Sequence, residues 1–320
     1  MELGPGLSGK QIKKQIFAGH LIRIFEKMKK PTPILLVATC YFLLTTLYQD
    51  TYGQRKPRYY GAGTVSPRQP LKLQPYNLDS FYQKKAWISE KGDTLRYRLL
   101  LPENYDSSKA YPLLVFLHGA GERGVDNARQ LVHGGQFFLQ PQIRSRYPAI
   151  IVFPQCGEND FWSNVEVKWD DSAHQRKFSF PEAGEPTRAM GKLLGWLPDL
   201  EKDFKINRGQ RYVMGLSMGG MGTFELVRRK PAYFVAAVPI CGGANPKTAS
   251  KIKETAFWIF HGANDDVVPY QLSEEVFLAI QDYYVHEEVR FTLYSGTGHN
   301  SWDPTFAEPD LMPWLFSHKK

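Results

Sequence analysis

Cysteine is scarce in this sequence, and its few cysteines form no metal-binding pattern. The chain of 320 residues contains 3 cysteines and 8 histidines. No CxxC pair occurs, and no two histidines stand at the spacing of zinc ligands, so we expect no structural metal site. Three cysteines are also too few for a fold that disulfides hold together. The sequence therefore predicts a domain that is stabilised by its hydrophobic core.

Long hydrophobic runs are also missing, except near the N-terminus. Residues 33–48 are mostly apolar, but such a run is short for a membrane span, which needs about 20 residues. Three lysines precede it at positions 27–30, and small residues occur near Gly53. Read from Met28 as the start, the segment has the charged beginning, apolar middle and cleavage site of a signal peptide. We therefore expect residues 1–53 to be a leader that directs export to the periplasm or the extracellular space. The alternative is an uncleaved membrane anchor at 33–48.

Outside the leader, the chain has only a small excess of positive charge. The formal net charge is +8, and residues 1–53 supply seven basic against three acidic side chains. The rest of the chain holds 33 basic and 29 acidic side chains, which is too small an excess to argue for a nucleic-acid partner. Hydrophobic residues make up 42% of the chain and no repeat divides it, so one large core is expected. We expect a linker or extended arm over residues 54–80 and a single domain over 81–320.

Ser217 lies in the sequence Gly-Leu-Ser-Met-Gly-Gly at positions 215–220. An apolar run precedes this motif at 211–214, and a stretch compatible with a helix follows at 221–229. Small residues on both sides of a serine let the chain turn sharply between strand and helix and leave the hydroxyl exposed, as in a nucleophile elbow. The alternative is a glycine-rich turn that merely contains a serine, because the motif by itself is weakly specific.

A second glycine-rich loop follows the apolar run at residues 111–117. It reads His-Gly-Ala-Gly-Glu-Arg-Gly over residues 118–124. Such a loop aims backbone N–H groups into a site without obstruction by side chains, as the stabilisation of an oxyanion requires. The expected donors are the N–H groups of Ala120 and Met218, whereas His118 is expected to shape the turn.

An acid and a histidine follow two later apolar runs. Asp265 comes shortly after the predicted strand at 256–260, and His299 lies in a loop after the one at 289–294. The chain order Ser217, Asp265, His299 is the order of the triad in α/β-hydrolases. Asp266 is the rival acid.

The predicted elements alternate in a way that indicates an α/β fold. Residues 81–89 and 94–101 read as an antiparallel hairpin. The later strands alternate with helical stretches such as 187–204 and 272–284, which predicts a mostly parallel central sheet with helices on both faces. Sites in such sheets lie at the carboxyl ends of the strands, and all five proposed residues follow predicted strands.

Taken together, these motifs resemble α/β-hydrolase esterases of the predicted-peptidase and carboxylesterase type, a group near the polyhydroxybutyrate-depolymerase-like and feruloyl-esterase-like enzymes. The resemblance extends over about residues 81–316. Besides the two glycine-rich motifs, it rests on Asp126-Asn127, Phe153-Pro-Gln-Cys156 with Trp162, Pro239-Ile-Cys-Gly-Gly243, Asp265-Asp-Val-Val-Pro269 and Gly298-His299 with Trp302.

The resemblance implies the α/β-hydrolase fold and a role for each site residue. It implies Ser217 as nucleophile, Asp265 as acid and His299 as base, with Ala120 and Met218 as oxyanion donors. In the family pattern the carboxylate stands four residues ahead of a proline, which selects the first aspartate of the pair. No cofactor is implied.

Four side chains near these motifs are candidates for substrate binding, and each has a structural alternative. Trp162 is otherwise a packing anchor. Glu122 and Arg123 are otherwise used in an internal salt bridge that holds the glycine-rich loop, and Trp302 otherwise packs the C-terminal helix. The charged segment 164–186, which prolines interrupt, resembles the family least and favours a polar, open cleft over a lipid tunnel.

Cys156 and Cys241 each follow a predicted strand. In the usual strand order of the hydrolase sheet, two other strands lie between these two. Neighbouring strands are about 4.8 Å apart, so the pair is beyond disulfide reach. We expect two buried free thiols.

The sequence thus predicts an exported serine hydrolase that cleaves carboxylic esters with small to medium acyl groups, with acyl or feruloyl decorations of polysaccharides among the substrates. One alternative is a serine peptidase of prolyl-oligopeptidase type, although no propeller-like repeat is present. The other is a binding protein on a hydrolase scaffold, which would normally lack a triad member. A membrane is a partner only if the leader stays uncleaved, and the sequence indicates no oligomeric state.

Overall fold

The structure is a computed structural model that describes residues 64–172, 174–283 and 288–320. The leader expected over residues 1–53, with its start at Met28 and its apolar run at 33–48, lies outside the described residues. Within the described ranges, no helix is both long and apolar enough to cross a membrane.

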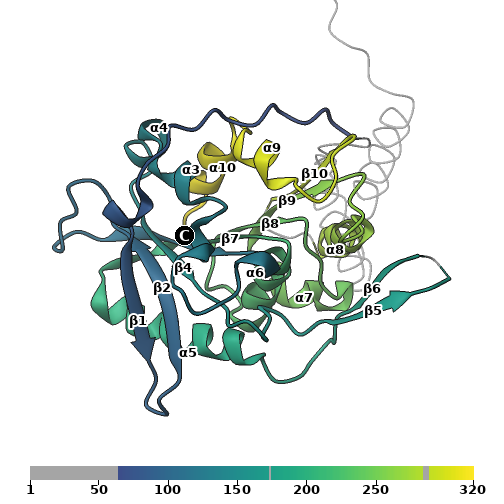
Figure 1. The fold of residues 1–320 in the computed structure, drawn as a ribbon, viewed down its shortest axis with the longest axis horizontal. Coiled ribbons are helices and arrows are strands. Elements are labelled where there is room, and N and C mark those ends of the chain that lie inside the picture. The colour runs from purple at the N-terminus through teal and green to yellow at the C-terminus, as the bar shows by residue number, and fades with distance from the viewer. Residues whose placement is uncertain (1–63, 173, 284–287) are drawn as a thin grey trace, which may run out of the picture. The chain divides into compact units, whose positions relative to one another are not determined.

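An eight-stranded sheet forms the centre of the fold, in the order β1-β2-β4-β3-β7-β8-β9-β10 (Figure 1). The predicted hairpin forms β1 (Gln83–Ile88) and β2 (Thr94–Leu100), which pair antiparallel. β2 also runs antiparallel to β4, whereas the other neighbouring pairs are parallel. The parallel strands are β3 (Tyr111–Leu117), β4 (Ile150–Pro154), β7 (Ile206–Leu216), β8 (Ala236–Ile240), β9 (Ala256–Gly262) and β10 (Val289–Tyr294). The predicted α/β class, with a mostly parallel sheet and an N-terminal antiparallel hairpin, is confirmed.

Helices cover both faces of this sheet because successive strand residues point to opposite sides. In β3, Leu113 and Val115 pack in one core, and Leu114 and Phe116 pack in the other. Figure 1 shows the two helical layers above and below the sheet. The first core is covered by α5 (Arg188–Asp203), α6 (Met218–Arg229), α7 (Ala249–Ile252) and α8 (Gln271–Gln281), and the second by α3 (Gly135–Leu139), α4 (Pro141–Arg144), α9 (Trp302–Phe306) and α10 (Leu311–Ser317). Short 3-10 helices are η1 (Leu78–Ser80), η2 (Ala120–Glu122), η3 (Arg129–Leu131) and η4 (Pro246–Thr248).

A second, two-stranded sheet forms within residues 164–186, and the sequence pattern did not predict it. β5 (Glu166–Asp170) pairs antiparallel with β6 (Gln175–Ser179). The hairpin projects from the body of the molecule in Figure 1. Apolar and charged residues alternate over only a few positions in this segment. Such a short alternation is a weak signal for a strand, so the sequence indicated only a charged segment.

The arm that precedes the first strand lies against the domain. Val65 forms an isolated bridge with Tyr294 of β10. The N–H groups of Gln74 and Tyr76 donate to glutamine side chains in and just after α3. Residues 64–80 therefore contact the rest of the domain near the beginning of the arm, at Val65, and again at Gln74 and Tyr76.

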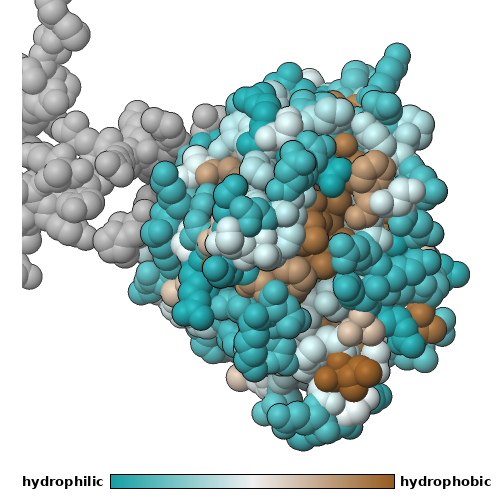
Figure 2. All heavy atoms as spheres, turned by 90° about the vertical axis from the view of Figure 1, so that its left-hand side faces the viewer, coloured by the Kyte–Doolittle hydropathy of each residue, from teal (hydrophilic) through white to brown (hydrophobic). Residues whose placement is uncertain are grey.

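Polar side chains cover most of the face in Figure 2, and apolar residues gather in a recessed band across its middle. Large apolar side chains that are at least 60% exposed are Ile88, Val125, Val132 and Trp169. They come from separate loops and hairpin ends of the described chain rather than from one helix face.

Cys156 and Cys241 are both free and buried. They follow β4 and β8, and the strands β3 and β7 lie between these two. The strand order on which the prediction of two buried free thiols rested is confirmed, and it keeps the two residues apart.

Candidate active site

Ser217 occupies the tight turn between β7 and α6. Its backbone has φ 54° and ψ −117°, a region that costs a side-chain-bearing residue of the order of 1–3 kcal/mol. The surrounding glycines permit this turn because nothing larger fits. A Cβ on Gly219 would lie 2.0 Å from the Leu117 carbonyl oxygen, and one on Gly215 would lie 2.3 Å from the Gly219 carbonyl oxygen. The strand, turn and helix thus have the geometry of a nucleophile elbow.

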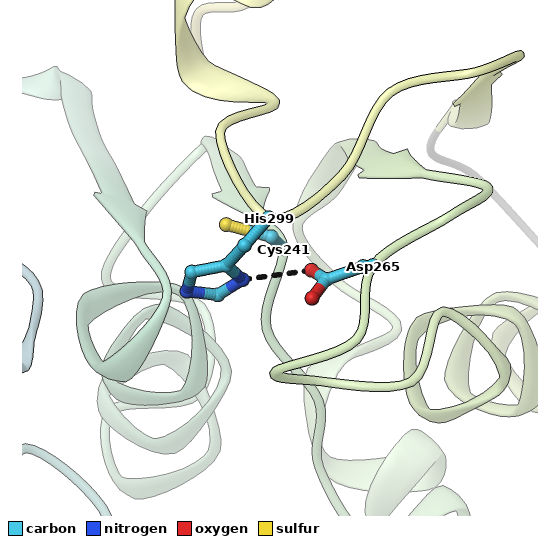
Figure 3. A group of neighbouring side chains, drawn as sticks. All are labelled: Cys241, Asp265 and His299. Atoms are coloured by element: carbon cyan, nitrogen blue, oxygen red, sulfur yellow. Dashed lines mark hydrogen bonds and ion pairs between the residues drawn. The ribbon is translucent and has the colours of Figure 1, made fainter.

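The structure brings Ser217, His299 and Asp265 together in one hydrogen-bonded row. His299 Nε2 lies 2.9 Å from Ser217 Oγ, and His299 Nδ1 lies 2.8 Å from Asp265 Oδ2. Figure 3 shows the imidazole pointing from its loop toward the Asp265 carboxylate. A base placed between a hydroxyl and a carboxylate can accept the hydroxyl proton while the carboxylate stabilises the resulting positive charge.

The carboxylate of Asp265 is buried and fully hydrogen-bonded. Its Oδ1 accepts from the N–H groups of Val267 and Val268 at 2.9 Å each, and its Oδ2 also lies 3.2 Å from His261 Nε2. Burial alone would raise the pKa of Asp265, but hydrogen bonds from His261, His299 and the backbone hold this pKa well below its usual range. Asp265 therefore stays charged. Asp266 is exposed to solvent, and His299 pairs with its neighbour instead.

Ala120 and Met218, the two expected oxyanion donors, both line the pocket beside Ser217. Met218 is the first residue of α6, where an N–H has no partner within the helix. Ala120 begins η2 in the glycine-rich loop. Among the described residues neither N–H donates a hydrogen bond, and both residues line the same pocket as Ser217 and His299. The prediction that these two N–H groups donate to an oxyanion stays a prediction, and the lack of a partner for either is compatible with it.

His118 anchors the glycine-rich loop from beneath. The N–H of Cys156 donates to His118 Nε2 at 2.9 Å, so the ring hydrogen is on Nδ1, which donates to the Gly119 carbonyl at 2.7 Å. Burial lowers the pKa of His118 to about 4, which keeps the ring neutral. The Gly124 N–H also donates to the Cys156 carbonyl. His118 thus shapes the turn rather than reaching a substrate.

The pocket around Ser217 has a volume of about 420 Å³, within the range of sites for small molecules. Its wall is mostly apolar. The side chains that make it so are Phe161, Val167, Phe178, Leu216, Met218, Met221, Val267, Val268 and Trp302. The expectation of a polar cleft is therefore wrong, because the charged hairpin turns its apolar side chains, Val167 and Phe178, toward the site.

The substrate-binding candidates have different surroundings. Trp162 is 0% exposed and is absent from the pocket wall. A Cβ on Gly222 would lie 2.3 Å from the Trp162 Cβ, and its indole meets the His118 ring edge to face. Trp162 is a packing anchor, and the expectation that it contacts substrate is wrong. Trp302 lines the pocket with its ring 5.7 Å from that of His299.

Glu122 and Arg123 do not form a salt bridge with each other among the described residues. Glu122 lines the pocket and lies 3.6 Å from His133 Nε2. Arg123 donates to the Ala120 carbonyl at 2.9 Å and stacks over the Phe161 ring. The expected internal salt bridge is not found for Arg123 among the described residues, whereas Glu122 lies within ion-pair distance of His133. Arg123 still braces the glycine-rich loop, through the carbonyl of Ala120.

Several pocket residues were missed by the sequence reasoning. His133 packs against Trp302 at a tilted angle, with ring centroids 4.8 Å apart. Val167, Arg176 and Phe178 reach the pocket from the unpredicted hairpin. The alternation of apolar and polar side chains along residues 166–170 and 175–179 could have indicated the two strands. It could not have indicated which face of the hairpin borders the pocket.

Cys241 lies beside the Asp265 and His299 pair (Figure 3), and one ligand-type atom of each lies within 4.8 Å of the others. Burial, together with the negative charge of Asp265, raises the pKa of the Cys241 thiol to about 12. A metal needs the thiolate, and the imidazole nitrogen nearest the carboxylate already donates to it. These three residues therefore do not fit a metal site, and Cys241 packs beside Asp265 and His299.

Comparison with known proteins identifies the family. The model of the esterase family described as "Putative esterase" matches residues 89–316. The chain is 28% identical over 177 residues to "Probable feruloyl esterase C" of Aspergillus terreus and 27% identical over 177 residues to "Feruloyl esterase C" of Emericella nidulans. In both cases 54% of this chain and 56% of the relative are covered, so the chain spans about half the length of these curated relatives.

Among solved structures, a thermostable esterase superposes with a TM-score of 0.66 at 30% identity, over 76% of this chain and 64% of that one. A feruloyl esterase module from Clostridium thermocellum, complexed with sinapinate, superposes with a TM-score of 0.57 at 18% identity, over 82% of this chain and 96% of that one. The second likeness concerns the fold alone. A shorter match, 35% identical over 79 residues, joins 24% of this chain to 12% of a bifunctional acetylxylan esterase/xylanase of Neocallimastix patriciarum. With its α/β-hydrolase fold and a family match over most of its length, the chain belongs to this esterase family of ester hydrolases.

Proposed function

We propose that the chain is a serine hydrolase that cleaves carboxylic esters through a covalent acyl-enzyme. The observation that carries the proposal is the position of the His299 ring, with one nitrogen 2.9 Å from Ser217 Oγ and the other 2.8 Å from Asp265 Oδ2. Membership of the esterase family supports the same reaction class. The nucleophile, base and acid are then Ser217, His299 and Asp265.

In this mechanism His299 Nε2 takes the Ser217 proton as Oγ bonds to the ester carbonyl carbon. Asp265 holds the Nδ1 hydrogen and stabilises the charged imidazolium. The N–H groups of Ala120 and Met218 donate to the developing oxyanion, and one such donor is worth about 3 kcal/mol of the barrier. When the C–O bond breaks, His299 returns its proton to the leaving alcohol. A water that His299 deprotonates then attacks the acyl-enzyme, the bond between Ser217 Oγ and the acyl carbon breaks, and His299 returns the proton to Oγ as the acid leaves.

We further propose that the acyl group is small to medium in size and that the alcohol part belongs to a polysaccharide. The pocket of about 420 Å³ with aromatic walls at Phe161, Phe178 and Trp302 suits an acetyl, short aliphatic or phenolic acyl group. The names of the feruloyl esterase and acetylxylan esterase relatives support substrates of this kind.

The test is a hydrolysis screen with the purified protein. It compares p-nitrophenyl acetate, butyrate, octanoate and palmitate, methyl ferulate and peptide anilides, with Ser217→Ala as the control. We expect turnover of the shorter esters and methyl ferulate. Rates that peak at palmitate would contradict the pocket argument. Cleavage of anilides without ester turnover would identify a peptidase, and binding without any turnover would identify a binding protein.

We also propose export directed by residues 28–53, on the basis of the charged, apolar and small-residue segments of that stretch. N-terminal sequencing of the mature protein from its native host is expected to begin near Gln54. Recovery in a membrane fraction with Met1 intact would support the anchor instead.

A further inference from the structure

One face of the β5–β6 hairpin borders the candidate active site. Val167 pairs with Phe178 across the hairpin, and Trp169 pairs with Arg176. Because side chains alternate along a strand, these four share one face. Three of them, Val167, Arg176 and Phe178, line the pocket that holds Ser217 and His299. The face thus brings two apolar side chains and one cation to the site.

The side chain of the cation on this face forms no salt bridge or hydrogen bond with any of the described residues. Arg176 is also exposed to solvent. On the opposite face, Lys168 pairs with Glu166 at 2.7 Å. A guanidinium offers a planar set of donors that matches a carboxylate. Arg176 is therefore free to bind an anionic group of a molecule in the pocket.

A carboxylate on the protein restricts where that anionic group can lie. Glu122 lines the same pocket and belongs to the glycine-rich loop. A Cβ on Gly119 would lie 3.0 Å from Glu122 Oε2 and 3.6 Å from the Ser217 Cβ, so this carboxylate is close to the reacting serine. Like charges repel, so a substrate carboxylate next to the reacting carbonyl is disfavoured. The anion must lie on the part of the substrate that extends toward the hairpin.

We propose that Arg176 is a specificity-determining residue that selects esters with a carboxylate remote from the reacting carbonyl. This inference rests on the ester hydrolysis proposed above and names a substrate class for the same site. The carboxylate has two possible sources, an acidic sugar or other acid on the alcohol side, or a dicarboxylic acyl group. An exposed ion pair is worth up to about 1 kcal/mol, or about fivefold in an equilibrium constant. A two- to fivefold preference is therefore expected.

The experiment measures kcat/KM on two pairs of esters in which only the charge differs. On the alcohol side the pair is 4-acetoxybenzoate and 4-acetoxybenzamide. On the acyl side the pair is the mono-p-nitrophenyl ester of adipic acid and p-nitrophenyl hexanoate. The ratio of the anionic to the neutral substrate is compared in the wild type, Arg176→Gln, Arg176→Glu and the matched control Lys177→Gln. Lys177 is the next residue of β6, and its side chain points to the opposite face.

For at least one pair, we expect the ratio to fall two- to fivefold in Arg176→Gln and further in Arg176→Glu, with Lys177→Gln unchanged. Sodium chloride at 0.5 M should also lower the wild-type ratio of anionic to neutral substrate, because salt screens exposed charges. The pair that responds identifies the source of the carboxylate. Equal ratios in the wild type and Arg176→Gln for both pairs, or an equal fall in Lys177→Gln, would overturn the role of Arg176. Failure of the wild type to hydrolyse the neutral esters would instead overturn the proposed esterase activity.

Discussion

The Nδ1 atom of His299 lies 2.8 Å from Oδ2 of Asp265, and the Asp265 side chain is completely buried. A carboxylate in this position holds the imidazole in one tautomer, so an amide in its place would favour the wrong one. Asp265→Asn is therefore expected to lower kcat by about 10⁴-fold, as in other triads. Asp266→Asn is the matched control, because its side chain is exposed, and should stay within about twofold of the wild type in an ester hydrolysis assay. The reverse ranking would assign the acid to Asp266.

Two substitutions of Ser217 test its role as nucleophile and the strain of its backbone separately. Ser217→Ala is expected to abolish turnover with little change in melting temperature, because alanine carries the same strain at φ 54° and ψ −117°. Ser217→Gly should also be inactive but more stable by about 1 kcal/mol, since glycine adopts this region without a Cβ penalty. Thermal unfolding of the three proteins checks this. Equal stability of the glycine and alanine variants would show that the elbow is unstrained, and turnover by a folded alanine variant would exclude Ser217 as the nucleophile.

The contact between Gly222 and Trp162 leaves no space for a methyl group. A Cβ on Gly222 would lie 2.3 Å from the Trp162 Cβ, and Trp162 is 0% exposed, so neither side can yield easily. Gly222→Ala is expected to destabilise the domain by about 1–3 kcal/mol. Gly157→Ala is the control, because nothing lies within 4 Å of its Cβ position. Urea unfolding measures both, and an equal effect of the two substitutions would contradict the packing role of Trp162.

The buried ring of His118 makes stability depend on pH in a defined window. Its folded-state pKa is about 4, below the ordinary value of 6.5, so the unfolded chain binds a proton that the folded chain does not. This contribution to the free energy of unfolding is complete above pH 6.5 and falls by about 3 kcal/mol as the pH drops to 4. Asp265 acts in a lower window, because its pKa lies below 3.8.

Urea unfolding between pH 7 and pH 4 tests this dependence. His118→Gln is expected to lose the slope between pH 6.5 and 4, whereas His133→Gln, at a partly exposed position, should keep it. A slope that persists in His118→Gln would mean that another group takes up the proton.

The two buried thiols should be inert in the native protein. Burial raises the pKa of Cys156 and raises that of Cys241 to about 12, which removes the reactive thiolate. A maleimide is expected to modify neither residue in the folded protein and both after denaturation without reductant, as peptide mass mapping would detect. Absence of labelling at both after denaturation would indicate a disulfide and would contradict the observed strand order.

Much of the fold and of the candidate site was predictable because the relevant signals are local. The apolar run at 111–117 coincides with β3, and the helical stretch 187–204 matches α5 closely. Small residues around Ser217 predict a tight turn whatever surrounds them. Ser217, Asp265 and His299 each follow a predicted strand. Parallel strands have their carboxyl ends at one edge of the sheet, so the three residues were expected to lie close together.

Other features depend on side chains that meet only in three dimensions. The sequence by itself determined the sharp turn at Ser217, the chain order of Ser217, Asp265 and His299, and the type of sheet, since these follow from short patterns of size and polarity. Only the tertiary structure decided that Trp162 lies beneath Gly222, that Glu122 faces His133 rather than its neighbour in sequence, and that Arg176 turns toward the pocket. The direction of these side chains depends on how segments distant in the sequence pack together, and a short sequence pattern does not specify that packing.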